Sequence, residues 1–467
     1  MNIIKQRFLR GPNLYRDTPC LLTLVDLGDL DGQSTRALPG FIARLVALVP
    51  GLLKHRCSRG APGGLIERME EGTDLAHVVE HVAIELQCMA GSDVRFGFER
   101  SVRNEPGQYR VVCGYQFEQV AEEAFALAMR LVETCARQQQ IDFAPLLAAL
   151  RETGADCAIG TSTAAVLAAA KRRGIPAIRL TETANLFQLG WGSRQKRLQA
   201  TITGRTNHIG VDIASDKQLT KTLLEDAGLP VPEGETVRTF EDALRVAGEI
   251  EGPVTIKPLD ANQGKGVTTV CSTPEEIRAA FDHAKEYGRS VIVEQYLKGR
   301  DYRVLVTGDN VAAASWRRPP HITGDGKSTI RELVELENRN PARGEGHTNI
   351  LTRIPLDAIA QEVVRKQGFE FDSVPQAGKL VELRGNANLS TGGTAEDVTD
   401  LLPASTVRIC VRAAKTIGLD VTGIDIVCED ISKPLAAQGG GIIEVNAAPG
   451  IRMHQYPSAG KPRDAGE

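Results

Sequence analysis

Apolar residues recur along the first third of the chain with two different periods. Short, mostly apolar runs at Cys20–Leu27 and Tyr109–Tyr115 predict β-strands. Gly40–Val49 and Glu118–Gln138 have the spacing of amphipathic helices, and the second of them is rich in alanine. We therefore expect residues 1–150 to form a first domain of mixed α/β structure.

One further helix is predicted to begin after Thr73 or Asp74, either of which can cap it, and to end at Gly91. Its apolar residues share one face: Leu75, Val78, Val79, Val82, Leu86 and Met89. The opposite side carries polar residues in the spacing H-x-x-E-H: His77, Glu80 and His81.

The H-x-x-E-H spacing places two imidazoles one helical turn apart, with a carboxylate between them. Inverted zinc peptidases use this pattern for two metal ligands and a general base. Glu85, one turn beyond His81, is a candidate for a further oxygen ligand. The alternative interpretation is an ordinary polar helix face. His77, Glu80 and His81 are thus a candidate Zn²⁺ site that the sequence alone leaves open.

From about residue 155 the pattern changes. Cys157–Ala170 predicts a strand, a tight turn and a helix, with Ser162 near the helix start, where free N–H groups favour an anion. We expect residues 155–215 to precede a larger domain at 216–467. The pattern there predicts strands at Pro253–Pro258, Val291–Leu297, Tyr302–Val306, Val421–Cys428 and around Ile442 and Ile443.

The last of these strands carries Glu444 and Asn446, which lie two residues apart and therefore point to the same face. A carboxylate and a side-chain amide supply oxygen ligands that suit Mg²⁺ carrying substrate phosphates. Asp425, on the preceding strand, is a third candidate ligand. An edge strand with a solvated polar face is the alternative for this stretch taken alone.

Two glycine-containing turns are candidates for phosphate binding. Gly264–Gly266 follows a strand that ends at Lys257, and such a turn lets backbone N–H groups and a lysine approach phosphate closely. Arg384–Thr394 is a second turn of this type, rich in Gly, Ser and Thr. Residues 315–350, between the two turns, are basic and read as loop-rich, so we expect a mobile insertion on the substrate side.

The composition of the chain argues against several classes of protein function. A length of 467 residues predicts two or three domains, and 42% hydrophobic with 24% charged residues is typical of globular proteins. A net charge of −4 and an aromatic content of 4% argue against a nucleic-acid partner. The nine cysteines include no CxxC pair, which favours reduced thiols in the cytoplasm. No apolar run approaches the length of a membrane span, so we expect neither a membrane segment nor a signal peptide.

Taken together, residues 216–450 resemble the ATP-grasp fold, whose members clamp ATP between two lobes and join a carboxylate to an amine through an acyl phosphate. Further motifs resemble the cyanophycin synthetase family over essentially the whole chain. They are Arg10–Asn13, His55–Gly60, the helix around His77–Leu86, Asn388–Thr394, and Glu444–Gly450 followed by Arg452–His454. The expected fold class is a multidomain α+β and α/β protein, with an N-terminal α/β domain followed by an ATP-grasp fold.

The resemblance implies an N-terminal domain that holds the polymer and an ATP-grasp domain that phosphorylates the C-terminal carboxylate of a poly-aspartate backbone. The amine of L-aspartate then attacks. It implies ATP and Mg²⁺ as cofactors, a cyanophycin or aspartate-rich primer as partner, and a cytoplasmic homo-oligomer.

The resemblance also implies site residues at the matching positions. They are Lys217, Lys257, Gly264, Lys265 and Gly266 for the ATP phosphates; Glu294, Leu297 and Asp301 for adenine and ribose; Asp425, Glu444 and Asn446 for Mg²⁺; Arg303 and Arg384 for charge on the transferring phosphoryl group and the tetrahedral intermediate; and Ser162, Ser390 and Arg317 for the substrate.

Two departures from the family pattern matter. The family continues into a Mur-ligase-like domain, whereas this sequence contains no G-x-x-x-x-G-K-[ST] motif, so we expect it to lack the arginine-adding activity. Many relatives carry histidine where Gln263 stands, and a glutamine can only hydrogen-bond, not act as base for the attacking amine. Three alternatives stay open: a ligase for another acidic or peptide substrate, a non-catalytic polymer-binding accessory protein, and a zinc-dependent peptidase that cuts polymer into primers.

Overall fold

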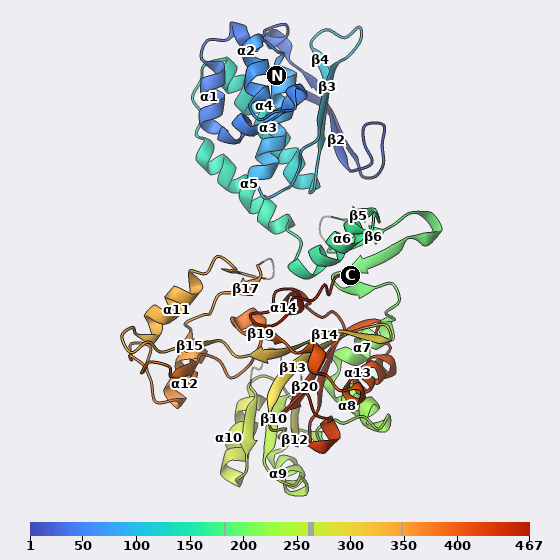
Figure 1. The fold of residues 1–467 in the computed structure, drawn as a ribbon, viewed down its shortest axis with the longest axis vertical. Coiled ribbons are helices and arrows are strands. Elements are labelled where there is room, and N and C mark those ends of the chain that lie inside the picture. Colours follow the sequence, from blue (N-terminus) through green and yellow to red (C-terminus); the bar gives the residue numbers. More distant parts are fainter. Residues whose placement is uncertain (182–183, 260–265, 347–348) are drawn as a thin grey trace. The chain divides into compact units, whose positions relative to one another are not determined.

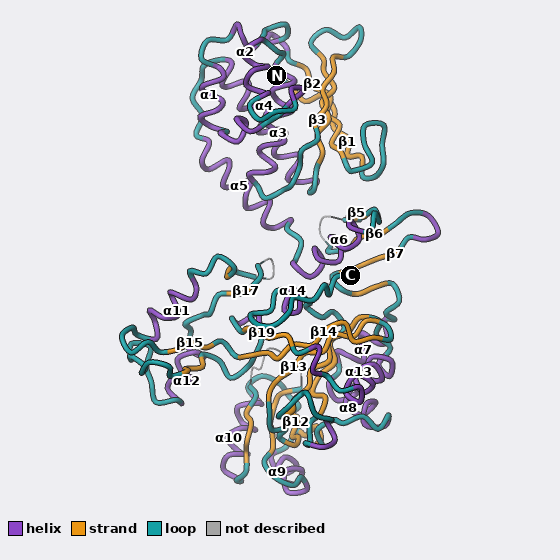
Figure 2. Tube along the Cα trace, in the orientation of Figure 1, coloured by secondary structure: helices purple, strands orange, loops and turns teal. Residues whose placement is uncertain are grey.

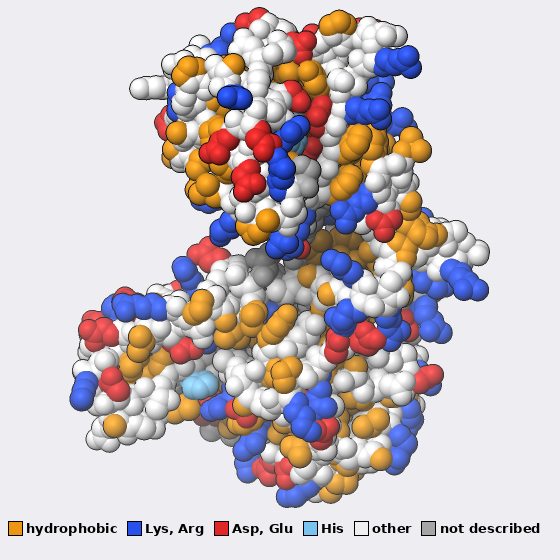
Figure 3. All heavy atoms as spheres, turned by 45° about the horizontal axis from the view of Figure 1, so that its top comes forward, with side chains coloured by type: hydrophobic (Ala, Val, Ile, Leu, Met, Phe, Trp, Pro, Cys, Tyr) orange, Lys and Arg blue, Asp and Glu red, His pale blue; other side chains and the backbone are white. Residues whose placement is uncertain are grey.

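The computed structural model describes residues 1–181, 184–259, 266–346 and 349–467 (Figure 1). The chain forms two compact units: residues 1–158 with 178–185, and residues 159–177 with 186–467. Among the described helices, none is both long and apolar enough to span a membrane. On the face shown in Figure 3, acidic and basic side chains are interspersed, in line with the small net charge of −4.

The first unit is built on an antiparallel sheet with the strand order β1-β2-β4-β3. Its strands are β1 (Asn2–Leu9), β2 (Cys20–Asp26), β3 (Gly97–Ser101) and β4 (Gln108–Gly114). Its α-helices are α1 (Phe41–Leu48), α2 (Gly64–Glu71), α3 (Leu75–Met89), α4 (Glu118–Ala136) and α5 (Phe143–Cys157). Helices α3 and α4 pack against each other and lie on one side of the sheet (Figure 2).

Helix α3 begins where the sequence predicts. The Asp74 carboxylate accepts a hydrogen bond of 2.8 Å from the backbone N–H of His77, which caps the first turn. Most of the predicted apolar face is buried, and Met89, at the end of the helix, is partly buried. The opposite side is not solvated, however, because Glu80 and His81 are only 5% and 8% exposed. The alternative of an ordinary polar surface face is therefore excluded for these two residues.

The predicted strand at Cys157 is wrong, because Cys157 is the last residue of helix α5. Leu147, Leu150 and Gly154 recur at three- and four-residue intervals before it and are buried. Gly154 packs so closely against the backbone of Ala90 that a Cβ atom there would overlap the Ala90 carbonyl oxygen. The predicted helix that follows is present as α6 (Thr161–Arg172).

The second unit contains two larger sheets. The first has the order β11-β10-β12-β9 and packs against two helices, α9 and α10. These elements are β9 (Gly234–Val237), α9 (Phe240–Glu249), β10 (Val254–Pro258), β11 (Thr268–Cys271), α10 (Pro274–Lys285) and β12 (Val291–Gln295).

The other large sheet has five antiparallel strands in the order β19-β14-β13-β20-β21. They are β13 (Arg300–Thr307), β14 (Asn310–Arg318), β19 (Thr394–Asp397), β20 (Val421–Cys428) and β21 (Gly441–Asn446). Helices α8 (Lys217–Asp226) and α13 (Ala404–Ile417) share an apolar core with this sheet. The remaining elements of the second unit are β6 (Leu186–Leu189), β7 (Lys196–Gln199), β8 (Ile202–Thr203), α7 (His208–Ser215) and α14 (Arg452–Gln455), and β5 (Ala177–Arg179) begins at the last residue before the segment 178–185 of the first unit.

Most of the segment that we expected to be loop-rich, 315–350, instead belongs to a folded insertion with a core of its own, and its first residues form the end of β14. Its elements are β15 (His321–Thr323), α11 (Ile330–Asn338), β16 (Arg343–Gly344), β17 (Leu351–Thr352), α12 (Ala358–Lys366) and β18 (Leu380–Glu382). Thr329 and Glu332 form a capping box that starts α11, and Ile330 and Val334 are fully buried. The core includes Val381 and Leu383, which lie beyond the segment, so a reading confined to 315–350 misses it.

Candidate functional site

The register of the five-stranded sheet aligns polar residues in a row across it. Antiparallel pairing places Asp397 opposite Ser315, Ser315 opposite Arg303, Arg303 opposite Asp425, and Asp425 opposite Glu444. Because directly opposite residues in antiparallel strands share a face, these side chains project from the same side of the sheet. The structure thus brings the three predicted residues Arg303, Asp425 and Glu444 together.

Asp425 lies at the centre of a buried charge cluster. Both Arg303 and Arg317 donate hydrogen bonds to its carboxylate, at 3.0 Å and 2.9 Å from their Nη2 atoms, and Arg317 also binds Asp301. Burial alone would raise the pKa of Asp425, but the two arginines outweigh it and hold that pKa below its usual value. Burial raises the pKa of Asp301. Two cations and two carboxylates therefore nearly balance inside the sheet.

Glu444 and Asn446 offer the oxygen atoms that fit a divalent cation. No hydrogen bond or ion pair engages the Glu444 carboxylate within the described part of the chain. The Asn446 amide nitrogen donates to the Gly423 carbonyl at 3.4 Å, which leaves its oxygen available. Asp425 differs, because its two oxygens already accept hydrogen bonds from arginines. Its Oδ1 accepts one hydrogen bond and its Oδ2 accepts two, so a cation bound there would share the carboxylate with the two arginines.

A pocket next to these residues is lined by cations from two elements, Lys217 and Lys221 on α8 and Lys257 on β10, together with Glu294 and Glu444. Lys257 donates to Glu294 at 2.5 Å, and Lys221 lies 3.7 Å from the same carboxylate. Burial lowers the pKa of Lys221. Lys221 was not predicted from the sequence, although it follows Lys217 by one helical turn and therefore shares its face.

Two predicted nucleotide contacts have other partners in this structure. Asp301 pairs with Arg317, as described above. Leu297 lies beside Gly441, where a Cβ atom would come within 3.1 Å of its Cδ1. Of the predicted glycine turn, Gly266 has a left-handed φ of 70°. Gln263, Gly264 and Lys265 lie outside the described residues.

The predicted substrate residues lie on three different elements of the second unit: Ser162 on α6, Arg317 on β14 and Ser390 in a short 3₁₀ helix. The Ser162 hydroxyl accepts a hydrogen bond of 3.0 Å from the backbone N–H of Ile451, just after the Pro449-Gly450 turn. Arg384 is 5% exposed and pairs with Asp357 at 2.5 Å, so it belongs to the insertion. Ser390 lies in a short 3₁₀ helix, Leu389–Thr391.

His454, not predicted as a site residue, covers the middle of the polar row. Its Nδ1 lies 2.8 Å from the Ser315 hydroxyl, and the residue is 1% exposed. Burial, reinforced by the nearby Arg303 and Arg317, lowers the pKa of His454 to about 3. The imidazole is therefore neutral at physiological pH.

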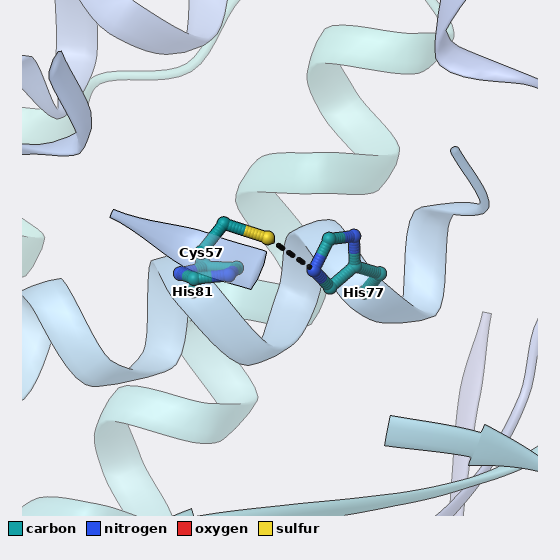
Figure 4. A group of neighbouring side chains, drawn as sticks. All are labelled: Cys57, His77 and His81. Atoms are coloured by element: carbon teal, nitrogen blue, oxygen red, sulfur yellow. Dashed lines mark hydrogen bonds between the residues drawn. The ribbon is translucent and has the colours of Figure 1, made fainter. Parts of the chain in front are cut away.

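In the first unit, Cys57, His77 and His81 turn their ligand atoms toward one another (Figure 4), all within 4.8 Å. The Cys57 sulfur lies 3.3 Å from Nε2 of His77. Cys57 has a positive φ of 49°, which is uncommon for a residue with a side chain and is found at functional sites. Sequence reasoning offered Glu85 as a further ligand and did not single out Cys57. One thiolate and two imidazoles suit Zn²⁺ with an open fourth position.

Glu80 lies beside this cluster, with its Oε1 3.9 Å from Nε2 of His81. Burial, together with the acidic neighbours Glu99 and Asp74, raises the pKa of Glu80 to about 8. Gly97 on β3 makes room for it, since a Cβ atom there would overlap the Glu80 carboxylate. Burial lowers the pKa of His81 to about 3, so this imidazole is a neutral donor of a lone pair. Glu85, by contrast, is not part of the cluster.

Comparison with known proteins matches two separate stretches of the chain to two family models. Residues 22–137 match the family model described as cyanophycin synthase-like N-terminal domain. Residues 216–314 match the model described as carbamoyl-phosphate synthase L chain, ATP binding domain. A solved structure, a bifunctional glutathione synthetase from Pasteurella multocida, aligns with a TM-score of 0.53 and 30% identity, over 74% of this chain and 50% of that one.

Among curated proteins, the cyanophycin synthetase of Synechocystis sp. is 44% identical over 99% of this chain and 54% of its own length. That of Geminocystis herdmanii is 43% identical over the same shares. The chain spans about half the length of these curated relatives. It thus combines a cyanophycin synthetase-like N-terminal domain with an ATP-grasp domain, which confirms the predicted fold class.

Proposed function

We propose that this chain is an ATP-dependent acid–amine ligase of the cyanophycin synthetase type. It would phosphorylate the C-terminal carboxylate of a poly-aspartate backbone and join L-aspartate to it through an acyl phosphate. The observation that carries the proposal is the pocket that is lined by Lys217, Lys221 and Lys257 together with Glu444. The identity to cyanophycin synthetases along the whole chain supports this choice of substrate.

The polar residues around the pocket have different proposed roles according to their charge. Glu444 and Asn446 would hold Mg²⁺, which neutralises the ATP phosphates when bound. Lys217, Lys221 and Lys257 surround the same pocket, where they would offset the remaining phosphate charge. Glu294 keeps two of these lysines in place, at 2.5 Å and 3.7 Å. Before ATP binds, the Glu294 carboxylate offsets part of the repulsion between Lys221 and Lys257.

Arg303 is suited to stabilise the transferring phosphoryl group. It is 8% exposed, lies in the polar row next to Asp425, and is held there by a bidentate pair. A cation fixed before the reaction costs little reorganisation when charge develops. Arg384 lies on the insertion side and would act on the acid being activated. Ser162 and Ser390 would contact the polymer end.

Asp301 fits the ribose role less well, because Arg317 already occupies its carboxylate. By the same pairing, Arg317 would act on substrate through the charge cluster. Roles for Gln263, Gly264 and Lys265 in covering the phosphates follow from family resemblance alone.

The test is ADP release with Mg²⁺, ATP, L-aspartate and a cyanophycin-like primer, compared with each omission. Glu444→Gln should reduce turnover by at least about a hundredfold, since a lost cation ligand affects the charged transition state directly. Glu429→Gln is the matched control, because Glu429 is half-exposed and pairs only with Lys298 among described residues. Primer-dependent release with a different amino acid would indicate another ligase. Primer binding without any ADP release would indicate an accessory protein.

A second function is favoured by the cluster of Cys57, His77 and His81, with Glu80 beside it. We propose that this site binds Zn²⁺ and hydrolyses polymer into primers, with Glu80 as general base. When bound, Zn²⁺ would activate water, and its charge would favour the ionised form of the nearby Glu80, which would then take the proton. Polymer cleavage should occur without ATP and stop on chelation. A His77→Ala/His81→Ala variant with unchanged zinc content would contradict the site.

None of the nine cysteines forms a disulfide bond, which supports a reducing compartment such as the cytoplasm. We retain the expectation of a homo-oligomer there, which light scattering of the purified chain would test.

A further inference from the structure

Three side chains of the first unit form a hydrogen-bonded chain that leads to one of the candidate zinc ligands. Nδ1 of His81 lies 2.8 Å from Nδ1 of His55. Nε2 of His55 lies 2.8 Å from Oε2 of Glu85. The side chains of His55 and Glu85 are 13% and 18% exposed, so water competes little for these bonds. Neither residue belongs to the cluster of Cys57, His77 and His81.

The chemistry of the carboxylate determines where each proton in this chain lies. An ionised Glu85 can only accept, so Nε2 of His55 must carry a proton and donate it. In a neutral His55, Nδ1 is then an acceptor. Nδ1 of His81 must therefore be protonated and donate to it. As a result, the lone pair of His81 lies on Nε2, the atom that is left for a metal.

His77 has a different partner but presents the same atom. Its Nδ1 lies 2.9 Å from the Thr73 hydroxyl, while its Nε2 faces the Cys57 sulfur at 3.3 Å. A hydroxyl can donate or accept, so Thr73 orients the ring without choosing the tautomer. The Glu85–His55 pair both orients the His81 ring and selects its tautomer.

The backbone is shaped to admit this pair. Gly51 lies against the Glu85 carboxylate so closely that a Cβ atom would overlap Oε1. Any residue other than glycine at position 51 would push Glu85 away from His55. Residues Pro50–Lys54 form a short 3₁₀ helix that leads directly into His55. Two separate segments, helix α3 with Glu85 and the stretch from Gly51 to His55, thus bring Glu85 and His55 together.

We propose that Glu85 and His55 are positioning residues that hold His81 in the tautomer and orientation in which Nε2 binds the metal. This inference rests on the proposed zinc site but does not depend on what the site cleaves. The carboxylate makes His81 a stronger ligand by polarising the chain of imidazoles. Loss of such an outer partner typically weakens metal affinity by about 10- to 100-fold.

The test measures metal affinity of the whole chain, not activity. Zn²⁺ dissociation constants would be obtained by competition with a coloured chelator for wild type, Glu85→Gln, His55→Asn and the double variant. Co²⁺ substitution adds a spectroscopic readout, because a thiolate–cobalt absorption band reports coordination directly. The unfolding temperature of each metal-free protein shows whether the variant is folded. Glu71→Gln is the control, since Glu71 is an exposed acid on α2 that pairs with Arg59.

We expect Glu85→Gln to weaken Zn²⁺ binding about tenfold and to shift the cobalt spectrum, with the unfolding temperature of the metal-free protein unchanged. In the His55→Asn background, Glu85→Gln should have less than a twofold effect, because Glu85 acts only through His55. A full tenfold effect there would mean that Glu85 attracts the cation by charge alone, and would overturn the proposal. So would unchanged affinity in both single variants. If wild type binds no Zn²⁺, the metal site itself fails, which is a distinct result.

Discussion

At the scale of the residue, His454 shows how burial sets a protonation state. Its ring is nearly inaccessible and neutral, with a folded-state pKa of about 3 against an ordinary 6.5. Below pH 6.5 an unfolded chain would bind a proton at this position, whereas the folded chain would not. The stabilisation is therefore complete above pH 6.5 and is lost as the pH falls toward 3.

We therefore expect His454→Asn to flatten the acid limb of the stability curve by about 1.4 kcal/mol for each pH unit below 6.5. Denaturant unfolding followed by tryptophan fluorescence measures this directly, because Trp191 and Trp316 both lie in the second unit. His208→Asn, at an exposed histidine of the same unit, should leave the slope as it is. An unchanged slope in His454→Asn would show that this ring is not the titrating group.

Glu80 tests the division of roles in the first unit. Its Oε1 is 3.9 Å from Nε2 of His81, beside the three candidate ligands rather than among them. Glu80→Gln should therefore keep Zn²⁺ affinity within about threefold while polymer cleavage falls by at least about a hundredfold, as expected when a general base is removed. Glu70→Gln, on the exposed side of α2, is the control. Loss of zinc in Glu80→Gln would make Glu80 a ligand instead.

Residues that the sequence did not predict share one property: their partners are distant in the chain. His454 meets Ser315 across 139 positions, and Cys57 meets His77 across 20. The spacing of neighbouring residues in the sequence does not predict contacts between positions that are so far apart. Lys221 is the exception, because its one-turn spacing from Lys217 was visible in the sequence. Glu444 and Asn446 were predictable because strand alternation alone places them on one face.

At the scale of the element, strand β20 packs closely against Arg303 and Pro449 at Gly423. Gly423 lies opposite Asn446, and a Cβ atom there would come within 2.9 Å of Arg303 Cδ and 3.0 Å of Pro449 Cβ. Glycine at this position lets the Arg303 side chain lie flat across the strand toward Asp425.

Gly423→Ala should displace Arg303 and lower primer-dependent ADP release by at least about tenfold, with little change in the affinity for primer. Gly248→Ala in α9 is the matched control, because its added methyl group meets no described atom within 4 Å apart from the nearby backbone of its own helix. That control should be neutral or stabilise by about 0.5–1 kcal/mol, as alanine does in helices. Full activity in Gly423→Ala would show that the function of Arg303 does not depend on glycine at position 423.

Elements with a regular apolar period were predictable, and the insertion was not. Helix α3 and strands β2 and β20 follow their apolar patterns closely. The insertion builds its core from short elements that are separated by polar segments, so each one alone resembles a loop. Helix α5 ends at the apolar residue Cys157, and the apolar residues Ala158 and Ile159 follow directly, so the sequence pattern does not show where the helix ends.

At the scale of the whole molecule, the two candidate chemistries lie in separate compact units, each with its own core. The activities should therefore be separable by mutation. His77→Ala/His81→Ala should abolish cleavage but keep ADP release on short primers within about twofold, and Lys257→Met should do the reverse. Both reactions would be followed on the same primer preparations. Loss of both activities in either variant, with unfolding temperatures unchanged, would contradict independent sites.

The central claim is that the second unit extends an aspartate backbone with ATP, and one measurement tests it most directly. Primer, Mg²⁺, ATP and L-aspartate are incubated with wild type, Glu444→Gln and the control Glu429→Gln, and products are analysed by intact mass together with ADP. We predict one added aspartyl residue per ADP released in wild type and in the control, and almost none in Glu444→Gln. ADP release without primer extension, or extension that persists in Glu444→Gln, would contradict the proposed function.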